Sequence, residues 1–405
     1  MRFPQHRVEE FLEDFRALVE CESPSSDPQA LTASARLVAE AGQRITGIRP
    51  SISTVEGFPH VLFHIGTGPR RVLLVGHHDT VWPRGTLATM PWSVEGDRIS
   101  GPGTDDMKGG VLIALHAVGL LVQEHDETDL DGISVLITAD EELGSPTSQP
   151  LIERLSREAE AVLVFESGGD AGEVKIARKG VAIYSLEVIG RAAHAGVEPE
   201  RGVNASVEAA HQILAIDAMT GTGGGGSGET TVVPAVTRSG TTTNTVPARA
   251  SVGIDSRAVT AAEQQRIDDR LRALEPHHPE AQLVLHGGIN RPPLEEDTAR
   301  ALFTRAQETA AQLGHPPLEA VRVGGGSDAN FAAGMGAPTL DGLGTVGGGS
   351  HADDEHALLS WIPRRIELTA ALVASLLQAP VPRPAAAPRR ASGPRSARTD
   401  AGVGS

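Results

Sequence analysis

The sequence has 405 residues but only one cysteine, Cys21, and few aromatic side chains. A single cysteine excludes an intrachain disulfide framework and any metal site built from several thiolates. Because the aromatic residues are only eight Phe, three Trp and one Tyr, we expect a core made mainly of aliphatic side chains. Cys21 is remote in sequence from the motifs described below, so we interpret it as a structural residue.

Basic residues and long apolar runs are also scarce. The 35 Lys and Arg residues stand against 52 Asp and Glu residues, which gives a net charge of −17. Such acidity argues against nucleic-acid binding, because neutralising phosphates requires excess Lys and Arg. The longest apolar run, Val111–Val122, is shorter than the ~18 residues of a membrane span. No signal peptide is visible at the charged N-terminus, so we expect a cytoplasmic protein without nucleic-acid or membrane partners.

Short β-rich runs alternate with helical patterns in the first part of the chain. The hydrophobic content of 40% is ordinary for a globular protein. The pattern indicates an α/β layered domain with a largely parallel sheet, in which chemistry gathers where strands end. The predicted strands are 71–75, 133–138 and 161–165, and the predicted helices are 9–20, 30–41 and 111–124.

A second pattern begins near Lys179 and indicates a smaller, inserted α+β domain. It contains strand-like runs at 181–188, 251–256 and 282–285 and helical runs at 203–216 and 261–274. We therefore predict one domain formed by residues 1–178 and 289–380, and an inserted domain formed by residues 179–288. The run Gly221–Gly228 lacks the Lys-Ser or Lys-Thr of a phosphate-binding loop and is interpreted as a surface loop.

The last segment, residues 381–405, is rich in Pro, Ala and Arg and has no periodic apolar pattern. Such a composition cannot bury enough surface to offset the entropy of ordering, so we predict a disordered tail. An interaction arm is the alternative interpretation of its arginines.

Five short segments carry His or carboxylate side chains in Gly-rich turns or after predicted strands. Each segment alone is a weak signal, but four successive strand–loop junctions carry such groups, and an α/β sheet brings these junctions together. Clustered carboxylates repel one another and need cations, and imidazole with carboxylate ligands suits zinc, cobalt or manganese. The segments are Gly76–Thr80 (GHHDT), Gly103–Gly110 (GTDDMKGG), Asp140–Glu142 (DEE), Glu166, and Gly347–Glu355 (GGGSHADDE).

Together with AAHAG (192–196) and GGGSDANF (324–331), these motifs resemble, in order and spacing, the M20 family of metallopeptidases. The resemblance is strongest to its glutamate carboxypeptidase-like branch and extends to about Leu377. It implies a larger zinc-peptidase-like α/β/α catalytic domain with an inserted, smaller α+β lid and dimerisation domain. It also implies a homodimer formed through the inserted domain. The lid is expected to close over the substrate on two connections, near Lys179 and Gly288.

The resemblance implies two divalent metal ions, most simply Zn²⁺, with Co²⁺ or Mn²⁺ as alternatives. Asp79 would orient the imidazole of His77. Asp105 is the second candidate for the bridging carboxylate, because Asp106 lies in the usual D-M-K-G-G frame. The implied ligands are His77 and Glu166 on one ion, Glu142 and His351 on the other, and Asp106 bridging both.

The resemblance also implies catalytic and substrate-binding residues. Glu141 matches the general base, and His194 matches a histidine that reaches the partner subunit's active site and stabilises the oxyanion. Asn244 matches a substrate contact, and Arg291 matches an arginine that binds the substrate's free carboxylate in a bidentate pair. Arg257 is a weaker candidate for that role. The segment 324–328 is expected to shape the pocket.

These residues imply a dizinc hydrolase that cleaves an amide or peptide bond next to a free carboxylate, as a carboxypeptidase or dipeptidase does. Two metal ions would polarise the scissile carbonyl and activate a bridging water, while Glu141 transfers its proton. A deacylase of N-acyl amino acids is the alternative within the family. A non-catalytic binding protein is disfavoured, because that class predicts lost ligands or a lost base.

Overall fold

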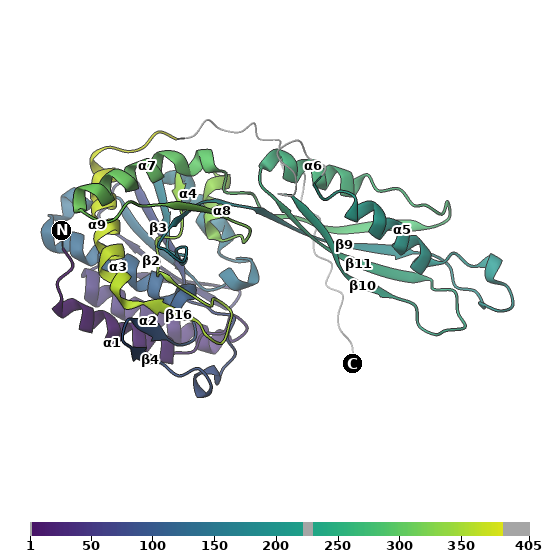
Figure 1. Ribbon diagram of the computed structural model, residues 1–405, viewed down its shortest axis with the longest axis horizontal. Coiled ribbons are helices and arrows are strands. Elements are labelled where there is room, and N and C mark those ends of the chain that lie inside the picture. Colours follow the sequence, from purple (N-terminus) through teal and green to yellow (C-terminus); the bar gives the residue numbers. More distant parts are fainter. Residues whose placement is uncertain (1, 222–229, 384–405) are drawn as a thin grey trace.

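The computed structural model describes residues 2–221 and 230–383, which form a rounded larger domain and an elongated inserted domain (Figure 1). Residues 222–228 of the predicted glycine-rich loop and residues 384–405 of the predicted tail lie outside the described part. The beginning of the predicted tail is ordered against the larger domain. Val381 is buried there, and the Arg383 guanidinium donates to the backbone carbonyls of Arg157 and Ala159, which fixes this short segment.

A six-stranded mixed sheet forms the centre of the larger domain. Its order is β1-β2-β6-β3-β7-β14. Strands β6, β3, β7 and β14 run parallel, whereas β2 pairs antiparallel to both β1 and β6. The strands are β1 (Ser51–Val55), β2 (Phe58–His64), β3 (Val72–His77), β6 (Ile133–Thr138), β7 (Ala161–Val164) and β14 (Thr339–Leu340).

Helices cover both faces of this sheet, because alternate side chains of the parallel strands are apolar on both sides. On β3, Val72 and Leu74 pack into the core beneath one helical layer, and Leu73 and Val75 pack into the core on the opposite face. The first layer contains α1 (His6–Glu20), α2 (Pro28–Thr46), α3 (Gly109–Glu124), α7 (Glu296–Leu313) and α9 (Ile362–Gln378), and the second contains α4 (Gln149–Glu158) and α8 (Asp328–Gly334).

The apolar sequence of α3 and the glycine at its start explain the position of this helix, which directly follows the loop of Asp106. Helix α3 is buried on all sides in its first three turns, as its continuous apolar sequence predicts. At its start, a Cβ on Gly110 would lie 2.0 Å from the carbonyl oxygen of Phe165. Glycine at this position therefore lets the helix and the loop before it approach the end of β7, where Glu166 follows.

Two small sheets complete the larger domain. The first pairs β8 (Val174–Arg178) with β13 (Ala320–Val323) in parallel. The second has the order β15-β16-β5-β4 and lies next to the loop that carries His351. Its strands are β4 (Ser93–Glu95), β5 (Arg98–Ser100), β15 (Gly347–Gly348) and β16 (His356–Leu358).

The inserted domain is a four-stranded antiparallel sheet with two helices, α5 (Ala205–Asp217) and α6 (Ala261–Arg272), on one face. Gly180 pairs with Ala258 near the larger domain, and Ile189 pairs with Arg249 at the far end. The sheet order is β10 (Thr231–Ser239), β11 (Arg249–Ala258), β9 (Gly180–Ile189) and β12 (Gln282–Arg291).

The predicted fold class, an α/β domain with an inserted α+β domain, is confirmed. The expectation of a largely parallel sheet needs correction, because the hairpin of β1 and β2 adds two antiparallel pairings at one edge. Every residue of β1 is exposed, so its sequence lacks the alternation that reveals a half-buried strand. Among residues 2–221 and 230–383, no helix has both the length and the apolar character needed to cross a membrane.

Candidate active site

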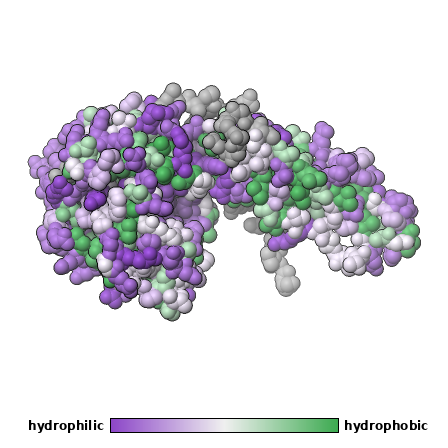
Figure 2. All heavy atoms as spheres, viewed as in Figure 1, coloured by the Kyte–Doolittle hydropathy of each residue, from purple (hydrophilic) through white to green (hydrophobic). Residues whose placement is uncertain are grey.

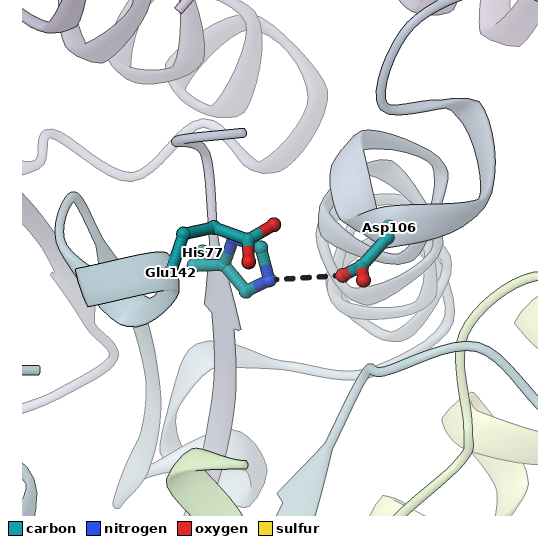
Figure 3. A group of neighbouring side chains, drawn as sticks. All are labelled: His77, Asp106 and Glu142. Atoms are coloured by element: carbon teal, nitrogen blue, oxygen red, sulfur yellow. Dashed lines mark hydrogen bonds and ion pairs between the residues drawn. The ribbon is translucent and has the colours of Figure 1, made fainter. Parts of the chain in front are cut away.

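Imidazole and carboxylate side chains converge at the carboxyl ends of the parallel strands of the larger domain. His77 is the last residue of β3, Glu141 and Glu142 follow β6 in a single helical turn, and Glu166 follows β7. Figure 3 shows His77 on its strand with its ring facing Asp106, which lies just before α3, and with the Glu142 carboxylate beside it. The fold therefore brings together groups that are far apart in sequence.

Asp106 lies between two histidines. Its Oδ1 is 3.2 Å from His77 Nε2, and its Oδ2 is 3.3 Å from His351 Nε2. Asp105, the second candidate for this position, instead accepts hydrogen bonds from Ser350 Oγ at 2.7 Å and from Thr345 Oγ1 at 3.2 Å. The structure thus places the carboxylate of Asp106, and not that of Asp105, between the two imidazoles.

One glutamate accompanies each histidine. Glu166 Oε1 is 3.8 Å from His77 Nε2, and Glu142 Oε2 is 3.4 Å from His351 Nε2. Donor atoms of His77, Asp106 and Glu142 lie within 4.8 Å of one another, and so do those of His77, Glu141 and Glu166. Oε1 of Glu142 is buried and has no hydrogen-bond partner among the described residues. This donor set of imidazole and carboxylate, without thiolate, fits divalent metal ions.

The electrostatics of the cluster also show that it is suited to cations. Burial raises the pKa of Glu142 and, more strongly, that of Glu166, because neighbouring carboxylates add to the desolvation. Burial would also raise the pKa of Asp106, but hydrogen bonds with His351 and His77 lower it far below its usual range. The hydrogen bonds with Asp106 and Glu142 raise the pKa of His351 to about 10. Divalent cations would replace these protons as the compensating positive charge.

Asp79 holds both His77 and the turn that carries the two glutamates. His77 Nδ1 is 2.9 Å from the carbonyl oxygen of Asp79, which leaves Nε2 facing Asp106. The buried Asp79 carboxylate accepts hydrogen bonds from the backbone N–H groups of Glu141 at 3.3 Å and Glu142 at 3.2 Å. It also accepts one from Ser25 Oγ at 2.7 Å. A ligand histidine fixed through its second nitrogen has a defined orientation and tautomer.

Glu141 is buried next to the cluster and forms an ion pair with Arg291. The distance from Arg291 Nη1 to Glu141 Oε1 is 2.8 Å. Burial raises the pKa of Glu141 to about 7, although the positive charge of Arg291 opposes this shift. A carboxylate with a pKa near neutrality is suited to accept and return a proton at physiological pH.

Arg291, at the end of β12, lies in the cluster and not on the outer part of the inserted domain. Its Nη2 donates to Ser145 Oγ at 3.0 Å and to the carbonyl oxygen of Glu141 at 3.1 Å, and it lies 3.8 Å from Asp328. Its buried Nε has no hydrogen-bond partner among residues 2–221 and 230–383. The guanidinium is therefore only partly engaged by the chain's own groups.

His194 and Asn244 lie together, but not at this cluster. They belong to the loops after β9 and β10, at the far end of the inserted sheet, where the Ala195 N–H donates to the Asn244 carbonyl at 2.9 Å. His194 is exposed and forms a β-bridge with Thr245. Within one chain, the structure does not bring these two residues to the other predicted site residues.

The weaker candidates have partners of their own. Arg257 forms a two-point contact with the Asp255 carboxylate on the same strand, at 2.8 and 2.9 Å. In the segment 324–328, Ser327 caps α8, and the buried Asp328 accepts a hydrogen bond from Thr138 at 3.1 Å. Asp328 also lies 3.8 Å from Arg291, next to the ion pair of Arg291 with Glu141.

Three residues without a predicted role support the cluster, namely Ser25, Trp82 and Glu355. Ser25 bonds to Asp79, and Trp82 donates from Nε1 to the Glu355 carboxylate at 2.6 Å. Glu355 lies inside the motif that contains His351, so its position was visible, but the sequence could not distinguish it from the neighbouring Asp353 and Asp354. In the structure, Glu355 is completely buried whereas Asp353 and Asp354 are exposed, and this difference identifies Glu355 as the supporting residue.

The fold and the cluster define a class of protein, a metal-dependent hydrolase with an inserted second domain. Residues 73–375 match the model of Peptidase family M20/M25/M40, and the chain belongs to this family. It is a metal-dependent enzyme of the peptidase and amidohydrolase type, as the sequence motifs predicted.

Similar proteins agree with this assignment. Carboxypeptidase G2 of Pseudomonas sp. (strain RS-16) is 35% identical over 320 residues, which cover 77% of this chain and 75% of that protein. A succinyl-diaminopimelate desuccinylase of Bradyrhizobium is 30% identical over 215 residues, covering 50% of this chain and 55% of that protein. In fold, the chain resembles a dinuclear metal-binding peptidase of family M20 from Bacillus subtilis, with a TM-score of 0.65, 15% identity and coverage of 93% and 99%.

Proposed function

We propose that the enzyme hydrolyses an amide or peptide bond next to a free carboxylate, with two divalent metal ions that are most simply Zn²⁺. The observation that carries this proposal is the position of Asp106, whose two carboxylate oxygens each face a different histidine at 3.2 and 3.3 Å. A carboxylate with one oxygen for each of two ions is the natural bridge in a two-metal site.

The donor groups divide into two sets around Asp106. When bound, the metal ions would supply Lewis-acid polarisation of the scissile carbonyl and activation of water. His77 and Glu166 would hold the first ion, and Glu142 and His351 would hold the second. Asp79 keeps His77 and the turn of Glu142 in place through the hydrogen bonds described above. Zinc is favoured because the set contains imidazoles, although cobalt and manganese suit the same donors.

Glu141 is the proposed general base. It directly precedes the ligand Glu142, so the two neighbouring carboxylates divide the work of proton transfer and metal binding. Its burial and raised pKa favour the uptake of a proton from the attacking water and its delivery to the leaving nitrogen. The contact with Arg291 orients the carboxylate within the site.

Arg291 is the proposed anchor for the free carboxylate of the substrate. Its Nε is a buried donor without a partner among the described residues, and its Nη groups lie beside Glu141. A substrate carboxylate bound to this guanidinium would hold the neighbouring amide bond close to the general base. The name of the similar carboxypeptidase G2 agrees with such a specificity.

We further propose that the enzyme is a homodimer in which His194 and Asn244 act in the active site of the partner subunit. Among the described residues, β10 is an edge strand of the inserted sheet, and α5 next to it exposes Val207 and Leu214. Figure 2 shows hydrophobic residues at the surface of the inserted domain. An edge strand with exposed apolar neighbours is suited to pair with its own copy across a two-fold axis. His194 would then stabilise the oxyanion.

A deacylase of N-acyl amino acids is the second candidate, and the similarity to a succinyl-diaminopimelate desuccinylase favours it. Both reactions cleave an amide with the same metal centre, so substrate structure must separate them. We would measure kcat/KM for acyl-glutamates, acyl-aspartates and dipeptides, each with added zinc, manganese or cobalt. Preference for dipeptides supports the first candidate, preference for the acyl-glutamates and acyl-aspartates supports the second, and no hydrolysis of any substrate with any metal contradicts both.

A further inference from the structure

Glu355 is a buried carboxylate that receives four N–H donors. Its Oε1 accepts from the backbone of Asp105 at 2.9 Å and of Asp106 at 3.0 Å. Its Oε2 accepts from the backbone of Gly103 at 3.0 Å and from Trp82 Nε1 at 2.6 Å. The side chain is completely buried, so water does not compete for these bonds. Three of the four donors belong to the loop that presents Asp106.

That loop needs such support, because it is not a regular helix. Asp106 has φ −122° and ψ 97°, and Met107 has φ −134° and ψ 38°, so both residues interrupt the helical turn before α3. Backbone N–H groups in such a segment lack helical partners and must be satisfied elsewhere when they are buried. Glu355 satisfies three of them at once.

The same short segment also carries a proposed metal ligand. Glu355 is four residues after His351 and directly precedes β16, which pairs antiparallel with β5. Arg98, on β5, donates from Nη2 to the Asp354 carbonyl at 2.6 Å. The small sheet thus fixes Glu355, and Glu355 in turn fixes the loop of Asp106 relative to that of His351.

We infer that Glu355 is a positioning residue of the proposed metal centre, which holds the carboxylate of Asp106 between His77 and His351 through its hydrogen bonds to the 103–106 loop. The inference rests on the metal centre of the proposed function, but not on the identity of the substrate. Groups that hold metal ligands in place typically change metal affinity about 10- to 100-fold when they are altered. We expect an effect of this size.

The decisive variant is Glu355→Gln, which keeps the shape of the side chain. One of its oxygens becomes an NH₂ group, so two of the four donors would face another donor whichever way the amide is turned. Isothermal titration of Zn²⁺ into the metal-free protein should show about 10- to 100-fold weaker binding, at least at one of the two sites. Because this readout needs no substrate, it remains valid if the proposed specificity is wrong.

Glu208 provides a matched control in the inserted domain. Its buried carboxylate accepts backbone N–H groups of His277 and His278, both at 2.8 Å, and an amide N–H of Gln212 at 2.8 Å. Glu208→Gln makes the same chemical change far from the metal ligands. We expect this control to lower the melting temperature without changing Zn²⁺ affinity. If both variants lose stability and both bind Zn²⁺ like the parent protein, Glu355 is only structural and the inference is overturned.

Trp82 offers a milder variant in case Glu355→Gln does not fold. Trp82→Phe removes one of the four donors and leaves the three backbone bonds in place, so we expect Zn²⁺ affinity to fall by less than in Glu355→Gln. Loading the parent protein with Zn²⁺ should change the fluorescence of Trp82, and Trp82→Phe should abolish that change while Trp92 and Trp361 remain. The coupling between Glu355 and the metal centre would be contradicted if Trp82→Phe bound Zn²⁺ as tightly as the parent and if the parent showed no fluorescence change on loading with Zn²⁺.

Discussion

The two domains present their predicted site residues in opposite ways. The larger domain brings together His77 at the end of β3, Glu142 after β6 and Asp106 just before α3, with donor atoms within 4.8 Å of one another. The inserted domain carries His194 and Asn244 at its far end, beyond the ten-residue strand β9, which spans roughly 30 Å at about 3.3 Å per residue. The parallel sheet brings residues of one chain together at one edge, whereas the far end of the inserted sheet lies away from that cluster within the same chain.

Two buried carboxyl groups of the larger domain, Glu141 and Asp105, also differ in pKa from the buried Glu208 of the inserted domain. In the larger domain, burial raises the pKa of Glu141 to about 7 and that of Asp105 to about 6. In the inserted domain, burial also opposes ionisation of Glu208, but hydrogen bonds from Gln212 and from two backbone N–H groups lower its pKa. Burial therefore disfavours the ionised form of Glu141 and Asp105, whereas hydrogen bonds from the chain favour the ionised form of Glu208.

The largest effect is expected from Glu141→Gln in the larger domain. Removing the general base should reduce kcat near the upper end of the roughly 10²–10⁴-fold range for proton-transfer groups. Zn²⁺ content should stay unchanged, because Glu141 is not among the proposed ligands. Steady-state kinetics together with metal analysis of the purified variant would test this, and a kcat equal to that of the parent would show that another group transfers the proton.

The second-largest effect is expected from His194→Ala, which tests whether the inserted domain acts in the active site of the partner subunit. His194→Ala should lower kcat by about 10²-fold, as expected for the loss of one oxyanion donor, without loss of metal. A mixture of His194→Ala and Glu141→Gln subunits, unfolded and refolded together, should regain activity. In each hybrid dimer, the site that retains Glu141 receives an intact His194 from its partner.

Random mixing makes half of the dimers hybrid, and each hybrid has one complete site, so about a quarter of the parental activity should return. Each variant refolded alone is the control. Failure of the mixture to exceed the separate variants, when hybrids are present by mass analysis, would place His194 in its own chain's site or outside catalysis.

The residues of the proposed metal cluster could be predicted from the sequence far better than the residues that hold them in place. His77, Glu142 and Glu166 each follow a buried strand whose apolar run is easy to recognise, and parallel topology then brings them together. The motif frame favoured Asp106 over Asp105, and the structure places Asp106 between the histidines. Contacts such as Trp82 with Glu355 join residues 273 positions apart, and no local pattern specifies them.

Strand β1, the outer strand of the hairpin, was missed for a different reason. Strand β1 is wholly exposed, so neither alternation nor an apolar run marks it.

The position of Arg291 illustrates a third limit. Its motif indicated a substrate-binding arginine, but only the fold shows that the end of β12 reaches back into the larger domain and pairs it with Glu141. A residue at the end of a strand of the inserted sheet, Arg291, thus belongs to the site of the larger domain.

Arg291→Ala tests whether this arginine binds the substrate, and we expect an effect mainly on KM. Loss of a charge-assisted contact of about 1.5–3 kcal/mol corresponds to a roughly 10- to 100-fold higher KM for substrates with a free carboxylate. The amidated form of the same substrate is the control, because it has no carboxylate to lose. An unchanged KM for the acid would mean that the guanidinium serves only Glu141, in which case kcat should fall for both forms.

The smallest expected effect is a difference in pH response between the two domains of the metal-free protein. A carboxyl group whose folded pKa is raised binds more protons in the native than in the unfolded state, so stability falls as pH rises from its unfolded pKa to its folded pKa. For Glu141 this window runs from 4.5 to about 7, and for Asp105 from 3.8 to about 6. Glu208, with a lowered pKa, has the opposite sign, and its contribution is lost only as pH falls below its ordinary value of 4.5.

Scanning calorimetry with a chelator should therefore show the parent protein losing thermal stability relative to Glu141→Gln between pH 5 and pH 7, while Glu208→Gln should follow the parent over this range. Comparing variants cancels the buried His60, His78 and His116, whose lowered pKa values act in the opposite direction. Saturating Zn²⁺ should reverse the trend, because metal binding requires the deprotonated ligands and stabilises the native state. Glu141→Gln should flatten the metal-free slope, since it removes one titrating group. A metal-free parent protein with the same pH response as Glu141→Gln over this range would show that Glu141 does not titrate with a raised pKa.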